Sequence, residues 1–407
     1  MNAALVLTVL LYALWGMAHN LNDVLIAQFK RAFALSDLQA SLVQSSFYIA
    51  YLVMPIPVAL FLQRFGYKNG IVTGLCVFAI GALLFWPAAN SLTYGAFLGA
   101  LFVIACGMTF LETAGTGIVV VLGAPERAEW RINLAQAFNP MGSILGVVIG
   151  REFILSGNEA EALSGAAQAQ AVQVPYLVIA LCVLLIAAMV ALVRFPDAAR
   201  TVRRGSPLVG LSRLLRSRIF VAGVLTQFLY VGTQIGLLSF FIRYAQHALP
   251  GISDRDAALY LTLTLVVFLA GRMSVLVLLR RWSSAQIATV FAACAAVLTL
   301  IAVWLPGAAG LAALVVASFF MSVMFPAIYA IGLHGNAAHS EAASALMIMA
   351  IVGGAVLTAV MGAVSDALTI AHAYLVPVGG FVAVLFYCGH AVRRGLTSAA
   401  GGAVATH

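Results

Sequence analysis

The chain has 407 residues, of which 63% are hydrophobic and only 8% are charged. A water-soluble domain of this length could not bury so much apolar surface, so the composition excludes an ordinary soluble globular protein. A membrane-spanning helix needs about 20 mostly apolar residues, which gives room for roughly twelve spans with short connections. No segment remains for a large soluble catalytic domain.

Hydropathy, interrupted by glycine, proline and charge, predicts an all-α integral membrane protein with twelve transmembrane helices. The sequence lacks the ten-residue alternating segments that are typical of a membrane β-barrel. The expected spans are residues 3–29, 38–62, 69–88, 93–122, 131–155, 174–194, 219–246, 257–279, 285–305, 308–334, 341–365 and 371–392.

A polar, arginine-rich segment at 195–218 divides the spans six and six. We therefore expect an N-terminal bundle at 1–194, a basic cytoplasmic linker, a C-terminal bundle at 219–395 and a disordered tail at 396–407. If both termini are cytoplasmic, most of the 21 lysines and arginines lie in cytoplasmic loops, as the positive-inside rule requires. The net charge of +8 is thus explained by solvated loops beside membrane spans, and since the basic residues form no single patch we expect no nucleic acid as a partner. The expected partner besides the substrate is membrane lipid, because the spans are apolar.

The five cysteines all lie within apolar runs, without a CxxC pair or a neighbouring histidine cluster. We interpret them as packing residues, and we expect no metal site and no cofactor. The sequence also contains no HExxH or GxSxG motif, so we expect no catalytic residues and no enzyme activity.

Two acidic residues, Asp23 and Glu112, lie well inside predicted spans. Charge inside hydrocarbon costs several kcal/mol, so both are candidates for proton coupling. Asn20 precedes Asp23 by three residues and shares its helical face, which makes a donor and acceptor pair for sugar hydroxyls or a proton. Structural alternatives remain: Asp23 could reach the membrane interface, and Glu112 could pair with a neighbouring helix.

Amide side chains form two further stripes. Asn133, Gln136 and Asn139 are spaced three apart in the fifth span, and Gln227 and Gln234 are seven apart in the seventh. Amides offer both donors and acceptors, so we expect these stripes to face a polar cavity and bind substrate. The alternative is that they only join helices through interhelical hydrogen bonds.

Basic residues near the turn between the second and third spans suggest gating or structural roles. The turn contains Arg64, Gly66 and Lys68, and Arg272 lies within the eighth span. We expect Arg272 to be a cytoplasm-directed or gating residue and not a substrate ligand. The six-plus-six arrangement and this turn resemble the major facilitator superfamily, although Gln63 and Tyr67 depart from its usual turn.

More specific motifs resemble the fucose/galactose/glucose proton symporter family over nearly the whole chain. They are Asn20-Leu21-Asn22-Asp23, Phe85-Trp86-Pro87-Ala88-Ala89, Leu111-Glu112-Thr113-Ala114, Asn133-Leu134-Ala135-Gln136-Ala137-Phe138-Asn139 and Tyr230-Val231-Gly232-Thr233-Gln234. Two departures stand out. Gly115-Thr116-Gly117 replaces the family's usual Ala-Asn-Pro, and Pro140 follows Asn139 where serine is often found.

The resemblance implies proton-driven uptake of a monosaccharide across a bacterial inner membrane. It assigns proton coupling to Asp23, sugar recognition and proton movement to Glu112, and the polar cavity to Asn20, Gln136 and Asn139. Protons would be the coupling ion. A monomer is expected because each chain should hold a complete pathway. A major facilitator exporter working by proton antiport is the alternative, since direction is not written in the sequence.

Overall fold

The computed structural model describes residues 6–17, 46–121, 127–149, 173–193, 207–305, 307–334, 336 and 339–396. The chain divides into two compact units, which are described separately. The first contains Met1–Leu122 and Phe138–Pro207, and the second contains Gly123–Ala137 and Leu208–His407. The division falls inside one helix, whose residues up to Ala137 are grouped with the second unit.

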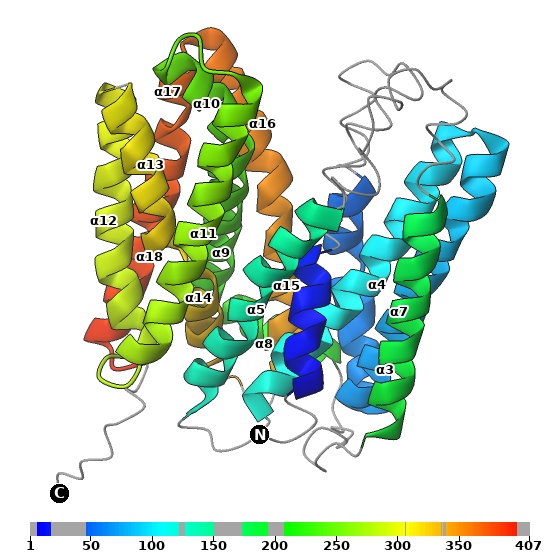
Figure 1. Ribbon diagram of the computed structural model, residues 1–407. Helices are drawn as coiled ribbons and strands as arrows, with labels where there is room; N and C mark the ends of the chain where they lie inside the picture. Colours follow the sequence, from blue (N-terminus) through cyan, green and yellow to red (C-terminus); the bar gives the residue numbers. More distant parts are fainter. Residues whose placement is uncertain are drawn as a thin grey trace, which may run out of the picture. The chain divides into compact units, whose positions relative to one another are not determined.

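The first unit is built from long apolar helices (Figure 1). α3 packs against both α4 and α7. The helices are Val6–Met17, 46–53, α3 (Pro55–Ser91), α4 (Tyr94–Val121), the later part of α5 (Ala128–Ile149) and α7 (Gln173–Leu192).

The second unit contains the remaining helices, with α12 packed on α13 and α18, and α9 packed on α16 and α18 (Figure 1). The helices are α8 (Pro207–Arg216), α9 (Arg218–Ser239), α10 (Phe241–Ala248), α11 (Asp254–Leu278), α12 (Ser284–Trp304), α13 (Ala308–Met321), α14 (Met324–Leu333), α15 (Ser340–Met349), the 3₁₀ turn η5 (Ala350–Val352), α16 (Gly353–Ala367), α17 (Ile370–Ala373) and α18 (Leu375–Arg393).

The helix ends differ from the hydropathy prediction in three ways. The predicted loop between the second and third spans is reduced to a kink at Gly66, whose φ of 79° only glycine adopts without strain. Four predicted spans of the second unit are each divided into two helices, for example at Phe240. The predicted polar linker also contains a helix, α8, because Leu208, Leu211, Leu214 and Leu215 recur at helical spacing.

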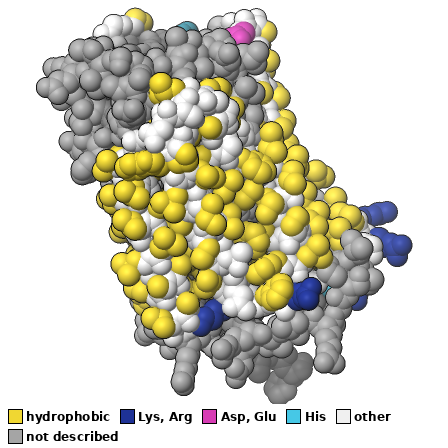
Figure 2. Space-filling view, turned by 90° about the vertical axis from the view of Figure 1, so that its right-hand side faces the viewer, with side chains coloured by type: hydrophobic (Ala, Val, Ile, Leu, Met, Phe, Trp, Pro, Cys, Tyr) yellow, Lys and Arg dark blue, Asp and Glu magenta, His cyan; other side chains and the backbone are white. Residues whose placement is uncertain are grey.

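Nine helices among the described residues are long and apolar enough to cross a membrane. On α7 the exposed side chains Val174, Leu181 and Leu185 recur along one face, each more than half exposed. Figure 2 shows a surface covered by hydrophobic side chains, with lysine and arginine gathered toward one end. An apolar surface of this extent requires lipid, so the chain is a multi-pass membrane protein.

Glycines allow very close helix crossings in each unit. In the first, a Cβ on Gly142 of α5 would lie 1.8 Å from the backbone oxygen of Ala13. In the second, a Cβ on Gly353 would lie 2.0 Å from the backbone oxygen of Phe228 on α9. Lipid supplies no hydrophobic drive between helices, so close backbone approach is what holds such crossings together. Each crossing brings a helix that carries predicted site residues against a neighbour.

Lys68, a predicted gating or structural residue, caps a helix end. Its Nζ donates hydrogen bonds to the backbone oxygens of Ala191 at 2.7 Å and Val193 at 2.9 Å. These carbonyls belong to the last turn of α7 and to the residue that follows it, where a helix lacks donors and carries partial negative charge. The structure therefore supports a structural role for Lys68.

We expect Lys68→Met to lower the free energy of unfolding by about 1 kcal/mol, the usual value for a partly exposed helix-end cation. Thermal unfolding of the purified protein in detergent measures the loss. Arg64→Met is the matched control, because Arg64 lies in the same turn, is exposed and stacks on the Phe65 ring at 5.3 Å. If both variants lost the same free energy of unfolding, the removal of a positive charge, and not the loss of the helix cap, would explain the effect.

Candidate functional site

Glu112 lies on α4 in the interior of the first unit, with only 2% of its surface exposed. Among the described residues, neither carboxyl oxygen has a hydrogen-bond partner at ordinary distance. The hydroxyl of Tyr51, a fully buried residue of helix 46–53, interacts with this carboxyl. A charged carboxylate buried with unsatisfied lone pairs is costly, so this group favours binding either a proton or a donor from a ligand.

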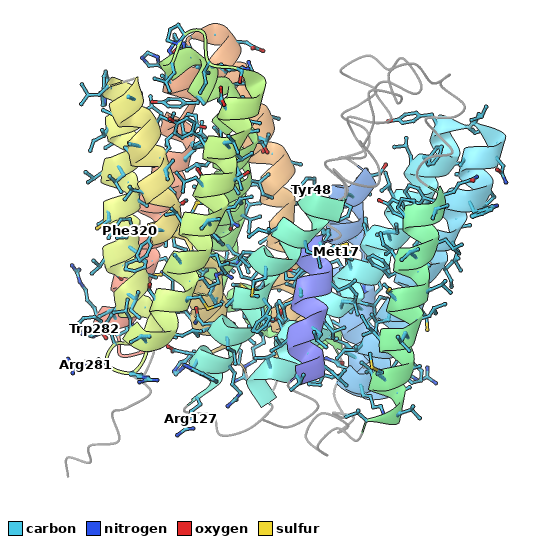
Figure 3. The ribbon with its side chains drawn as sticks, viewed as in Figure 1. Met17, Tyr48, Arg127, Arg281, Trp282 and Phe320 are labelled. Carbon is cyan, nitrogen blue, oxygen red and sulfur yellow. The ribbon has the colours of Figure 1, made fainter. Side chains whose placement is uncertain are left out.

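Aromatic residues from the first helix complete the surroundings of Glu112. Trp15 interacts with the Tyr51 hydroxyl, and the Tyr12 ring lies 5.7 Å from that of Trp15. The Tyr12 hydroxyl donates a 2.8 Å hydrogen bond to Oγ1 of Thr116, one turn after Glu112 on α4. Figure 3 labels Met17 at the end of the first helix and Tyr48 on helix 46–53. Three helices therefore meet around one buried acid.

Tyr12 and Tyr51 are not among the site residues predicted from the sequence. A tyrosine within an apolar span needs a partner for its hydroxyl when buried, and that signal could have selected both residues. The other candidates of this unit are less defined. Asp23 and Asn20 lie outside the described residues. Asn139 is half-buried, and its backbone oxygen lies so close to Gly16 that a Cβ there would clash.

In the second unit, Gln227 on α9 is completely buried. Neither of its amide atoms has a hydrogen-bond partner among the described residues. Gln234, two turns later, is half-buried. Between them, the Tyr230 hydroxyl donates a 2.6 Å bond to the backbone oxygen of Met321, where α13 ends. Gln227 thus has free hydrogen-bonding capacity, whereas Tyr230 is engaged structurally.

The amide side chains of the α5 stripe have different hydrogen-bond partners. Asn133 donates through Nδ2 to the backbone oxygen of Glu129 at 2.9 Å, on its own helix. Gln136, 4% exposed, contacts Arg272 of α11 within the second unit. The stripe was expected to face one polar cavity, but the structure gives its first member a local partner. Each of the two residues that belong to the second unit keeps one amide atom without a partner among the described residues, Oδ1 of Asn133 and Nε2 of Gln136.

The first turn of α5 contains an acid, Glu129, that is not among the site residues predicted from the sequence. Glu129 accepts a 3.0 Å hydrogen bond from the backbone N–H of Ser284, at the start of α12. Burial raises the pKa of this carboxyl, and the hydrogen bonds from Ser284 oppose the increase. Nearby, Arg281 and Trp282 are exposed at the α11–α12 turn (Figure 3). Glu129 therefore joins two elements of the second unit.

Taken separately, the first unit has a buried carboxyl and the second has buried amide atoms that lack a hydrogen-bond partner at ordinary distance among the described residues. These groups suit an uncharged polyhydroxylated ligand and a proton better than an ion or an apolar molecule. The long lipid-facing helices place these groups within a membrane-embedded protein. Such a fold with a polar interior is typical of a membrane transporter.

Comparisons with known proteins agree with this class. The sequence profile of the Major Facilitator Superfamily matches residues 4–358. The L-fucose-proton symporter of Escherichia coli is 40% identical over 395 residues, which cover 93% of this chain and 90% of that protein. A glucose/galactose transporter of Brucella abortus is 34% identical over 388 residues, covering 94% and 93%. The crystal structure of the E. coli fucose:proton symporter matches with a TM-score of 0.86 at 38% identity, covering 95% of this chain and 98% of that one.

The chain belongs to the major facilitator superfamily and, within it, to the fucose/galactose/glucose proton symporter family. This confirms the family and the fold class predicted from the motifs, and twelve helices agree with that fold. Proteins of the family are transporters and not an enzyme class.

Proposed function

We propose that this protein is a proton-coupled symporter that takes up a monosaccharide of the fucose, galactose or glucose type. The observation that carries the proposal is Glu112, a buried acid without a hydrogen-bond partner at ordinary distance among the described residues. Family membership supports the same function, because relatives are an L-fucose-proton symporter and glucose/galactose transporters. The protein acts as a carrier and not as an enzyme, with protons as its coupling ion and no further cofactor.

The mechanism is alternating access between two six-helix bundles, with boundaries near 1–194 and 219–395. Asp23 binds a proton from outside, and its neutral form lowers the cost of closing the cavity. Glu112 hydrogen-bonds sugar hydroxyls and takes part in proton movement. The neutral amides that complete the sugar site are Asn20, Gln136, Asn139, Gln227 and Gln234.

The protein works as a monomer in the inner membrane of a bacterium, with both termini in the cytoplasm. The basic linker and tail support this orientation, since lysine and arginine accumulate on the cytoplasmic side. The apolar outer surface of α7 supports contact with lipid.

Proton movement that accompanies the sugar tests the proposal. Right-side-out vesicles containing the protein are placed in weakly buffered medium and given fucose, galactose, glucose or a disaccharide control. We expect the medium to become alkaline with at least one monosaccharide and to remain unchanged with empty vesicles or a protonophore. External acidification would instead indicate proton antiport, and sugar binding without any flux would indicate a sensor.

A further inference from the structure

The chain contains a proline inside α5, at position 140. Proline has no backbone N–H, so the carbonyl four residues earlier, that of Gln136, loses its normal helical donor. The structure supplies a donor from another helix. Nη1 of Arg272 on α11 lies 3.0 Å from the backbone oxygen of Gln136 and 3.3 Å from its side-chain Oε1. One guanidinium group thus satisfies both oxygens of the same residue.

The guanidinium also determines which end of the Gln136 side-chain amide faces away from Arg272. Arginine can only donate hydrogen bonds, so the amide oxygen must point toward it and the NH₂ group must point elsewhere. That NH₂ group is buried and has no hydrogen-bond partner among the described residues. Gln136 therefore offers donors, and the group that satisfies it must be an acceptor.

Arg272 is itself held in a restricted position. It is 3% exposed, and its guanidinium lies 5.0 Å from the centre of the Phe268 ring, one turn earlier on α11. A buried cation is costly unless it is hydrogen-bonded, and stacking on an aromatic face offsets part of that cost. A lysine would not reproduce the arrangement, because its ammonium lacks the planar guanidinium that stacks on the ring and directs donors to the two oxygens.

We propose that Arg272 is a positioning residue that replaces the backbone donor missing at Pro140 and fixes Gln136 as a hydrogen-bond donor to an acceptor oxygen of the substrate. The second half of this inference rests on the proposed function, whereas the first half does not. It assigns Arg272 to the binding site indirectly, through Gln136, and it specifies the direction of one hydrogen bond to the sugar.

A double-mutant cycle without any ligand tests the first half. Arg272→Met leaves the Gln136 carbonyl without a donor, and Pro140→Ala restores the helical N–H. We expect Arg272→Met to lower the midpoint of thermal unfolding in detergent by several degrees, and by clearly less in the Pro140→Ala background. Pro87→Ala in α3 is the matched control, since Pro87 also lies inside a helix, and its effect should add to that of Arg272→Met. Additive effects for Pro140→Ala as well would overturn the proposal.

Sugar analogues test the second half in the wild-type protein and in Gln136→Leu. Each hydroxyl of the transported sugar is replaced in turn by hydrogen, which removes the acceptor, or by fluorine, which keeps a weak one. At one position we expect the deoxy sugar to bind the wild-type protein about tenfold more weakly than the unmodified sugar does, which is the effect of one hydrogen bond. The fluoro sugar should lose less affinity at that position. Both differences should disappear in Gln136→Leu.

The donor assignment would be overturned if deoxy and fluoro sugars lost equal affinity at every hydroxyl position whose contribution to binding depends on Gln136. Arg272→Lys separates positioning from charge, since it keeps the cation. We expect Arg272→Lys to weaken sugar binding and, like Gln136→Leu, to bind the deoxy and the fluoro sugar equally. If the fluoro sugar still binds more tightly than the deoxy sugar, as in the wild type, the proposal is contradicted. If no sugar binds to the wild-type protein, the proposed function fails, while the thermal cycle still decides the role of Arg272.

Discussion

Proteoliposomes containing the Glu112→Gln variant are expected to bring the sugar to equal concentrations on both sides and to accumulate none. Glutamine keeps the size and the hydrogen-bonding oxygen of the side chain, but it cannot gain or release a proton. One proton moving through 100 mV supplies about 2.3 kcal/mol, which corresponds to a sugar gradient of about 50-fold. Radiolabelled sugar uptake under an imposed potential measures this difference.

The same variant should bind sugar about tenfold more weakly, because one charge-assisted hydrogen bond is lost. Its affinity should also depend less on pH than that of the wild type, since Asp23 is the one proton-coupling acid of the pair that remains. Glu129→Gln is the matched control, since its amide oxygen can still accept the bond from Ser284. Tyr51→Phe removes only the hydroxyl beside the Glu112 carboxyl and should reduce accumulation without abolishing it. Wild-type affinity with unchanged pH dependence in Glu112→Gln would contradict its role.

The Asp23→Asn variant should separate transport from coupling. We expect accumulation to disappear, while exchange of internal for external sugar continues at a rate within a few-fold of wild type. Exchange needs no net release of a proton, whereas accumulation does. Counterflow of labelled sugar in proteoliposomes without a gradient, followed by uptake with one, gives both values in the same preparation.

Asp366→Asn is the control for Asp23, because Asp366 is an exposed aspartate near the end of α16. Asp366→Asn shows the effect of neutralising an exposed aspartate at a helix end. Asp23→Asn should resemble it if Asp23 only reaches the membrane interface and does not couple protons. Undiminished accumulation in Asp23→Asn would support that alternative. Loss of both exchange and accumulation would indicate that Asp23 is needed for binding or folding.

Much of the fold could be predicted from the sequence because membrane spans must be long and apolar. The spans at 93–122 and 174–194 agree with α4 and α7 within a few residues. The helix breaks could not be predicted in this way. A break such as that between α13 and α14 is stabilised by a distant hydroxyl, that of Tyr230 bonded to Met321, and hydropathy contains no signal for it.

The sequence by itself determined the class of protein and the family, and it selected Glu112 as a candidate, since a charge in a hydrocarbon span is rare and costly. Only the tertiary structure showed that the Tyr51 hydroxyl interacts with both Glu112 and Trp15 and that Arg272 satisfies the carbonyl affected by Pro140. Helical periodicity shows which residues share a face, but not which face meets which helix. Lipid is as apolar as a helix interface, so in a membrane the pattern of hydrophobic residues does not distinguish the two. The contacts follow instead from close packing between residues that are far apart in the chain, such as Gln136 and Arg272, which are 136 positions apart.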